Sequence, residues 1–138
     1  MKYALRSLAL PLLLSPLLAL AATPAPPGVK VYFISPRDGA TVSNPVTVRF
    51  GLKGMGVAPA GVQKDATGHH HLLIDVAPPP LDQPVPTDDQ HRHFGAGQTE
   101  TVITLPPGKH TLQLLLGDFA HMPHDPPVIS PPVSITVK

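Results

Sequence analysis

Proline and glycine divide the chain after residue 22 into short runs, and this division constrains the fold more than any other feature. The chain has 20 prolines and 11 glycines. None of the runs between them shows a sustained apolar period of 3.6 residues flanked by helix caps. Several runs alternate apolar with polar residues or are rich in β-branched residues, which is typical of strands. The runs expected as strands are 30–34, 45–52, 69–76, 98–105, 109–117 and 128–138.

The connections between these runs predict turns and long loops. Residues 53–68 are rich in glycine, and residues 77–90 hold a series of prolines that cannot lie inside a sheet. Pro106, Pro107 and Gly108 predict a hairpin between the runs 98–105 and 109–117, followed by a loop over 118–127. Pro131 and Pro132 predict a broken or bulged edge strand. We therefore expect an all-β fold, an antiparallel immunoglobulin-like β-sandwich of about seven strands.

The N-terminal residues 1–22 are typical of a secretory signal peptide. Two cationic residues precede an apolar stretch that ends in small residues, so cleavage is expected near Ala21 or Ala22. The stretch is shorter than the ~20 residues of a membrane-spanning helix, and two prolines interrupt it. We expect no permanent membrane anchor and a periplasmic or secreted protein. Its parts would be the signal peptide 1–22, an extended lead-in 23–28 and a single β-sandwich domain 29–138.

Charge and cysteine content exclude several classes of function. Loss of Lys2 and Arg6 with the signal peptide would leave eight basic against nine acidic residues, a balance that does not predict nucleic-acid binding. The absence of cysteine excludes disulfides, blue-copper sites, iron–sulfur clusters and thiol catalysis. No GxSxG, phosphate-loop or HExxH motif is present. The sequence therefore favours a binding or structural protein over an enzyme.

Three phrases of the sequence carry a resemblance to known domains. FGLKGMGVAPAG, GHHHLLID and GKHTLQLLLGD occur in this order, and together they resemble a family of small exported bacterial domains of unknown function. The likeness extends from about Val31 to Val137. The opening phrase SPRDGATVSNPVTVRF is similar to that of bacterial immunoglobulin-like domains. The resemblance implies a fold and an exported location, and it supplies no mechanism.

All eight histidines lie between positions 69 and 124, in groups at the ends of predicted strands or in neighbouring loops. Side chains at positions i and i+2 of a strand point to the same face. His69 would then pair with His71, and His91 with His93. Loops at one end of a sandwich converge even when they are distant in sequence. The candidate metal ligands are His69, His71, His91, His93, His121, His124 and Met122.

Imidazole suits a transition-metal ion because the neutral ring coordinates zinc, copper or nickel without the cost of a buried carboxylate. Copper is the first choice, since Cu(II) binds nitrogen ligands most tightly of the divalent first-row metals, and Met122 would add affinity for Cu(I). Zinc is the second. The protein would act as a carrier, buffer or accessory for the ion. The acids expected to orient the imidazoles are Asp75, Asp88, Asp89, Asp118 and Asp125.

A second interpretation treats the histidines as structural. The protein would then be a structural or protein-interaction domain of the cell envelope, with an envelope protein as its partner. His70 is expected to face the core and His110 to have a structural role within its strand. Asp118, directly after an apolar strand, is expected to cap the turn that follows.

Overall fold

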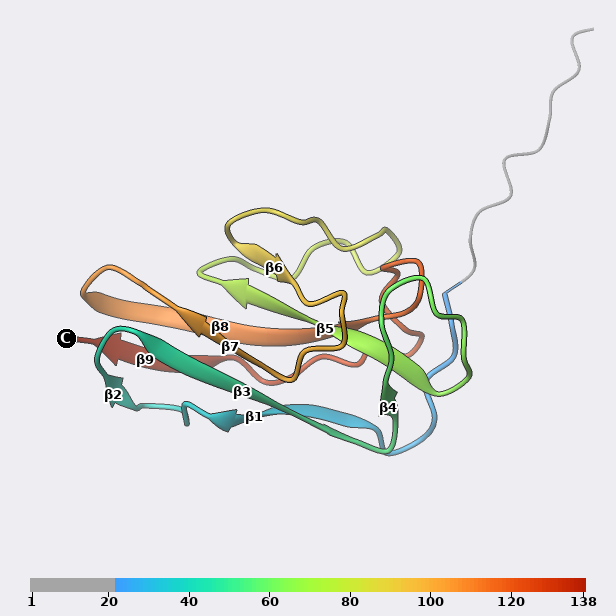
Figure 1. Ribbon diagram of the computed structural model, residues 1–138, viewed down its shortest axis with the longest axis horizontal. Helices are drawn as coiled ribbons and strands as arrows, with labels where there is room; N and C mark the ends of the chain where they lie inside the picture. The colour runs from blue at the N-terminus through green and yellow to red at the C-terminus, as the bar shows by residue number, and fades with distance from the viewer. Residues whose placement is uncertain (1–21) are drawn as a thin grey trace, which may run out of the picture.

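The computed structural model describes residues 22–138, which form nine strands (Figure 1). The predicted signal peptide lies outside the described residues except for Ala22. Within residues 22–138 no helix is long and apolar enough to cross a membrane. In chain order the strands are β1 (Lys30–Ser35), β2 (Thr41–Val42), β3 (Val46–Lys53), β4 (Gly56–Val57), β5 (Thr67–Ile74), β6 (His91–His93), β7 (Glu100–Ile103), β8 (Gly108–Gly117) and β9 (Val133–Val137).

The strands form two sheets packed face to face. One has the order β1-β3-β7, and the other has the order β2-β9-β8-β5-β4, with β6 also paired to β5. The long ladders are antiparallel, whereas β2 with β9 and β4 with β5 make short parallel pairs. The predicted all-β sandwich is thus confirmed, and its immunoglobulin-like character stays a prediction. Strands β2 and β4 were not predicted, because two residues are too short to show alternation.

The core lies between the two sheets. Val46, Val48 and Phe50 of β3 point inward, as their alternation with exposed or half-buried positions predicts. They meet Leu72 of β5 and Leu112 of β8 from the facing sheet. This apolar layer fixes the position of β5. Because side chains alternate along a strand, every second residue of β5 then points away from the core.

Strand β5 is buried on both faces. All residues from Gly68 to Ile74 are buried, which is typical of a strand covered on both sides and not of a half-exposed edge. Leu72 and Ile74 face the core, so His69, His71 and Leu73 face the other way. The chain between β5 and β7 runs along this strand (Figure 1) and pairs with its edge: the Ile74 amide donates to the Gln90 carbonyl, and the Phe94 amide donates to the His70 carbonyl.

The predicted hairpin over 98–117 is wrong. β7 pairs with β3 in the three-stranded sheet, whereas β8 pairs with β5 and β9 in the other sheet. The Asn44 side chain explains the end of β7, since its amide donates to the Leu105 carbonyl and its oxygen accepts from the Leu105 amide. Pro106 and Pro107 have no N–H to continue a ladder. The chain therefore crosses from one sheet to the other at this point.

Candidate metal centre

Strand β5 brings His69 and His71 to the same face, as the i, i+2 spacing predicts. Their ring centroids lie 4.8 Å apart, and their Nε2 atoms are 3.0 Å apart. Both side chains are fully buried. The two Nε2 atoms are within hydrogen-bond distance of each other, and both rings are shielded from bulk solvent.

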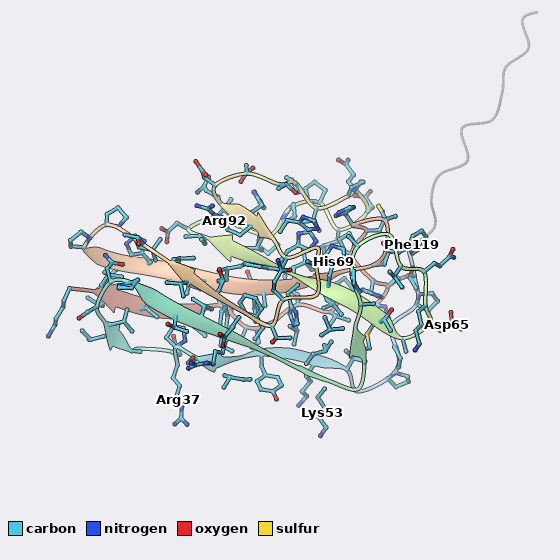
Figure 2. The ribbon with its side chains drawn as sticks, viewed as in Figure 1. Arg37, Lys53, Asp65, His69, Arg92 and Phe119 are labelled. Carbon is cyan, nitrogen blue, oxygen red and sulfur yellow. The ribbon has the colours of Figure 1, made fainter. Side chains whose placement is uncertain are left out.

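His93 joins this pair through strand register. β6 pairs antiparallel with β5 so that His93 lies opposite His71. Its ring centroid is 5.1 Å from that of His71 and 5.0 Å from that of His69. One potential ligand atom from each of the three side chains lies within 4.8 Å of the other two. Figure 2 shows His69 in the interior of the molecule, whereas the side chains of Arg37 and Lys53 point outward at the lower edge of the view.

A fourth imidazole, that of His121, comes from the loop after β8. Its centroid is 4.7 Å from that of His93 and 5.1 Å from that of His69. We call His69, His71, His93 and His121 the histidine cluster. His93 and His121 are half-buried whereas the other two are buried, so the cluster is closed on the β5 side and reaches solvent on the side of the loops.

Asp118 shapes the loop that carries His121. Its carboxylate Oδ1 accepts hydrogen bonds from the amides of Ala120, at 2.8 Å, and Met122, at 3.0 Å. Its own carbonyl accepts from the amide of His121 at 3.0 Å. The expectation that Asp118 caps this turn is confirmed. The turn places His121 at φ 65°, a conformation that non-glycine residues adopt only when the surroundings enforce it.

Two glycines make room for the rings, and sequence reasoning missed both. A Cβ on Gly117 would lie 2.8 Å from Nε2 of His71, and one on Gly95 would lie 2.3 Å from Cε1 of His93. Neither glycine has the positive φ that would by itself require glycine. The signal was the placement of a glycine directly after the apolar strand LLL and another after Phe94. Gly117 is the last residue of β8, and glycine in a strand marks a close approach of other groups, whereas Gly95 lies in the turn after β6.

Burial keeps three rings of the cluster, those of His69, His71 and His93, uncharged. It lowers the pKa of His69 to about 4 and that of His71 to about 2, with the neighbouring imidazoles acting in the same direction. The pKa of His93 is also lowered, by burial first and by His121 second. Asp118 acts against this shift at His69 without overcoming it. The rings of His69, His71 and His93 are therefore neutral at pH 7, which is the form that binds a metal.

The cluster also contains nitrogens that the described part of the chain leaves without a hydrogen-bond partner. They are Nδ1 of His69, Nδ1 of His71 and Nε2 of His93. Buried polar atoms are normally satisfied, and an exception calls for an explanation such as an ion. Zinc binds imidazole nitrogen at about 2.0–2.1 Å, so the Nε2 atoms of His69 and His71, which are 3.0 Å apart, can share one ion with Nε2 of His93. The Nδ1 atoms of His69 and His71 point away from that position, and such an ion would not satisfy them. The cluster can hold a transition-metal ion.

The structure places the remaining candidate ligands elsewhere. His91 lies opposite Leu73 in the β5–β6 ladder, and its Nδ1 lies 2.9 Å from the Asp88 carboxylate. That contact lowers the pKa of Asp88. Met122 is buried in the loop beside His121, with its amide bound to Asp118.

His124 belongs to the core face of β5. Its ring nitrogens lie 3.2 Å from the Thr67 carbonyl oxygen and 3.4 Å from that of Leu116. Its Cε1 would be 2.9 Å from a Cβ on Gly68, and position 68 faces the same side as position 70. The structure thus brings together four of the seven candidate ligands, leaves His91 and His124 apart, and gives Met122 a place in the same loop as His121.

Two other histidines occupy the places that the sequence predicted. His70 is buried in the core with its ring 5.1 Å from that of Phe50, and burial lowers its pKa to about 4. His110 bonds through Nδ1 to Asp75 at 2.6 Å and through Nε2 to the Pro106 carbonyl at 2.7 Å. The role of His110 is therefore to tie β8 to the end of β5.

Comparison with known proteins gave one finding. Neither the curated proteins nor the solved structures contain a match to the chain. The family described as Domain of unknown function (DUF4399) matches residues 48–138, which include the whole histidine cluster. This match covers more than half of the 138 residues and agrees with the resemblance seen in the sequence. The chain therefore belongs to the DUF4399 family of domains of unknown function.

Proposed function

We propose that this protein binds a transition-metal ion in the histidine cluster, copper first and zinc second, as a carrier, buffer or accessory. One observation carries the proposal. His69, His71 and His93 offer ligand atoms that all lie within 4.8 Å of one another. These atoms belong to rings whose lowered pKa values keep them neutral at pH 7. A neutral, inward-facing set of three imidazoles is a ready ligand set for such an ion.

The chemistry of the donors supports copper. All of the clustered ligands are imidazoles, which suit zinc, copper and nickel, whereas magnesium and calcium prefer oxygen. Among divalent ions Cu(II) binds nitrogen sites most tightly and favours four ligands in a tetragonal arrangement. His121 supplies a fourth ring within 5.1 Å of His69. Zinc is the alternative ion, because three imidazoles and an open position also form zinc sites.

The position of the cluster supports exchange of the ion and not permanent burial. His93 and His121 are half-buried and form the side nearest to solvent. An ion can enter and leave past these two rings while His69 and His71 hold it from within. The signal-like residues 1–22 support a periplasmic or secreted location, where a carrier or buffer would meet metal before it reaches other proteins.

The test uses protein that carries no polyhistidine tag. Calorimetric titration with Cu(II) and Zn(II), under competition from a chelator, should give one ion per chain. His71→Ala should abolish stoichiometric binding, and the matched control His110→Ala should leave it intact. An ion that binds only the folded state adds about 2.7 kcal/mol of stability at a hundredfold excess over Kd. For a domain of about 100 residues this raises Tm by roughly 10 °C. A purely structural domain would bind no stoichiometric metal, and its Tm would not respond to either ion.

A further inference from the structure

The first described residues, 22–28, run beside the loop that carries His121 (Figure 1). We call residues 22–28 the N-terminal strap. The Ala25 amide donates to the Asp125 carbonyl at 3.0 Å, and the Asp125 amide donates to the Thr23 carbonyl at 3.1 Å. Pro24 and Asp125 form a parallel bridge. The strap is thus fixed to the loop by backbone hydrogen bonds in both directions.

One side-chain hydrogen bond continues this contact toward the histidine cluster. The Thr23 hydroxyl donates to Oδ2 of Asp118 at 2.5 Å, across 95 positions of the sequence. Asp118 is 1% exposed, and its other oxygen holds the amides of Ala120 and Met122. The two oxygens of one buried carboxylate therefore join the strap to the two residues that flank His121.

His121 depends on such support because its backbone is strained. Its φ of 65° is costly for a residue with a side chain and persists only where neighbouring contacts enforce it. The contacts here are the Asp118 carboxylate on both sides of His121 and the hydrogen bond from the Val85 amide to the His121 carbonyl at 2.9 Å. If the Asp118 carboxylate turns or takes up water, the ring of His121 loses its place beside His93.

We infer that Thr23 and Asp118 are positioning residues, which hold His121 as a fourth ligand of the ion so that the N-terminal strap sets the affinity and geometry of the metal site. The inference rests on the proposed function and deepens it. Thr23 acts on the ion through Asp118 and then through His121. Loss of a group that hydrogen-bonds a metal ligand directly costs about 10–100-fold in metal affinity. We expect the lower end of this range, because Thr23 acts through Asp118 and three other imidazoles remain.

The test is a double-mutant cycle in the full chain. Thr23→Val keeps the shape of the side chain and removes the hydroxyl, whereas Thr23→Ser keeps the hydroxyl and is the matched control. Thr23→Val should weaken Cu(II) binding by about tenfold and change the Cu(II) electron paramagnetic resonance spectrum. Thr23→Ser should do neither. In the His121→Ala background, Thr23→Val should change neither the affinity nor the spectrum, because its effect passes through His121. An equal loss in both backgrounds overturns the inference.

A measurement without metal separates this inference from the proposed function. In Thr23→Val the amides of Ala120 and Met122 should exchange hydrogen faster, and the ring resonances of His121 should shift, while Thr23→Ser matches the wild type. Unchanged amides and ring resonances overturn the inference whatever the metal data show. If they change but the wild-type protein binds neither Cu(II) nor Zn(II), the proposed function fails. The role of His121 as a ligand then fails with it, while the positioning of His121 by Thr23 stands.

Discussion

Strands β5 and β8 carry histidines at both ends of their shared ladder, and the two ends differ in what the imidazoles face. At one end His110 of β8 bonds to Asp75, which directly follows β5. At the other end, where His69 lies opposite Gly117, the rings of His69 and His71 face other imidazoles. The pKa of His110 is raised by Asp75, whereas the pKa of His71 is lowered to about 2.

This difference shows that a histidine indicates a metal site only through the groups that its ring nitrogens face. A ring that donates to a carboxylate through one nitrogen and to a carbonyl through the other, as His110 does, has no free lone pair for an ion. A ring that is kept neutral among other neutral rings offers its lone pair to a cation. Asp118 is the acid that raises the pKa of His69, against the larger effect of burial. Its carboxylate already accepts hydrogen bonds from the Thr23 hydroxyl and from the amides of Ala120 and Met122.

The largest expected effect is the pH dependence of metal-free stability. A histidine whose pKa falls from 6.5 in the unfolded chain to about 4 when folded, as for His69, binds its proton more readily in the unfolded chain. Stability is therefore lost as pH falls below 6.5, and for His69 the loss levels off below pH 4. Each pKa unit corresponds to about 1.4 kcal/mol, so His69 alone contributes a loss on the order of 3 kcal/mol.

Urea unfolding in the presence of a chelator, at several pH values from 8 to 4, measures this dependence. His71→Leu removes the titrating group with the largest pKa shift and should flatten the curve between pH 6.5 and 4. At the other end of the ladder, where His110 bonds to Asp75 (the acid-paired end), the pH dependence of stability has the opposite sign. The raised pKa of His110 adds stability below pH 6.5, and this stability is lost as pH rises through the folded pKa. An equally steep acid slope in His71→Leu would contradict the burial of a neutral His71.

The faces of β5 on which the histidines lie, and the β-sandwich itself, could be predicted from the sequence. Alternation along GHHHLLID placed His69 and His71 on one face and His70 on the other, because the side-chain period of a strand is two. The structure confirms the close contact of the first pair and the core position of His70. Apolar runs separated by proline and glycine likewise indicated the β-sandwich, since burial and turn chemistry are local properties of a sequence.

The partners of these residues could not be predicted, because they depend on pairings between distant segments. The register that sets His93 opposite His71 follows a long proline-rich connection with no periodic signal. His121 reaches the cluster through a positive φ, and the spacing of the HMPH group equally favoured His124. Pro106 and Pro107 suggested a hairpin because turn residues specify that the chain turns, and they do not specify the sheet that it enters.

The next largest effect concerns the space beside His71. Gly117→Ala adds a methyl group that would lie 2.8 Å from Nε2 of His71. Overpacking of this kind costs about 1–3 kcal/mol, and we expect Cu(II) affinity to fall by at least about tenfold because the ring must leave its position. Gly56→Ala is the matched control, since its nearest neighbour would be at an ordinary 3.5 Å. Calorimetric titration measures both, and an unchanged affinity in Gly117→Ala would show that His71 is not a ligand in this position.

A smaller effect is expected at the acid-paired end. Asp75→Asn removes the charge that faces His110, and the pair is partly exposed, with Asp75 40% accessible. Such pairs contribute about 1 kcal/mol or less. The loss should be greater at pH 6, where His110 is charged, than at pH 9, and Cu(II) affinity should not change. Urea unfolding at the two pH values, with a copper titration of the same variant, checks both statements. A drop in copper affinity would indicate that the two ends are coupled.

The smallest effect separates two histidines that are two positions apart on β6. His91 faces Leu73 and bonds to Asp88, whereas His93 faces His71. His91→Gln should change the Kd for Cu(II) by no more than about twofold, the range of a surface substitution that removes no ligand. His93→Gln should weaken binding far more, because it removes one of the three imidazoles whose ligand atoms lie within 4.8 Å of one another. Equal losses in the two variants would mean that β6 presents both rings to the ion, which would require the β5–β6 register to shift from the one in this structure.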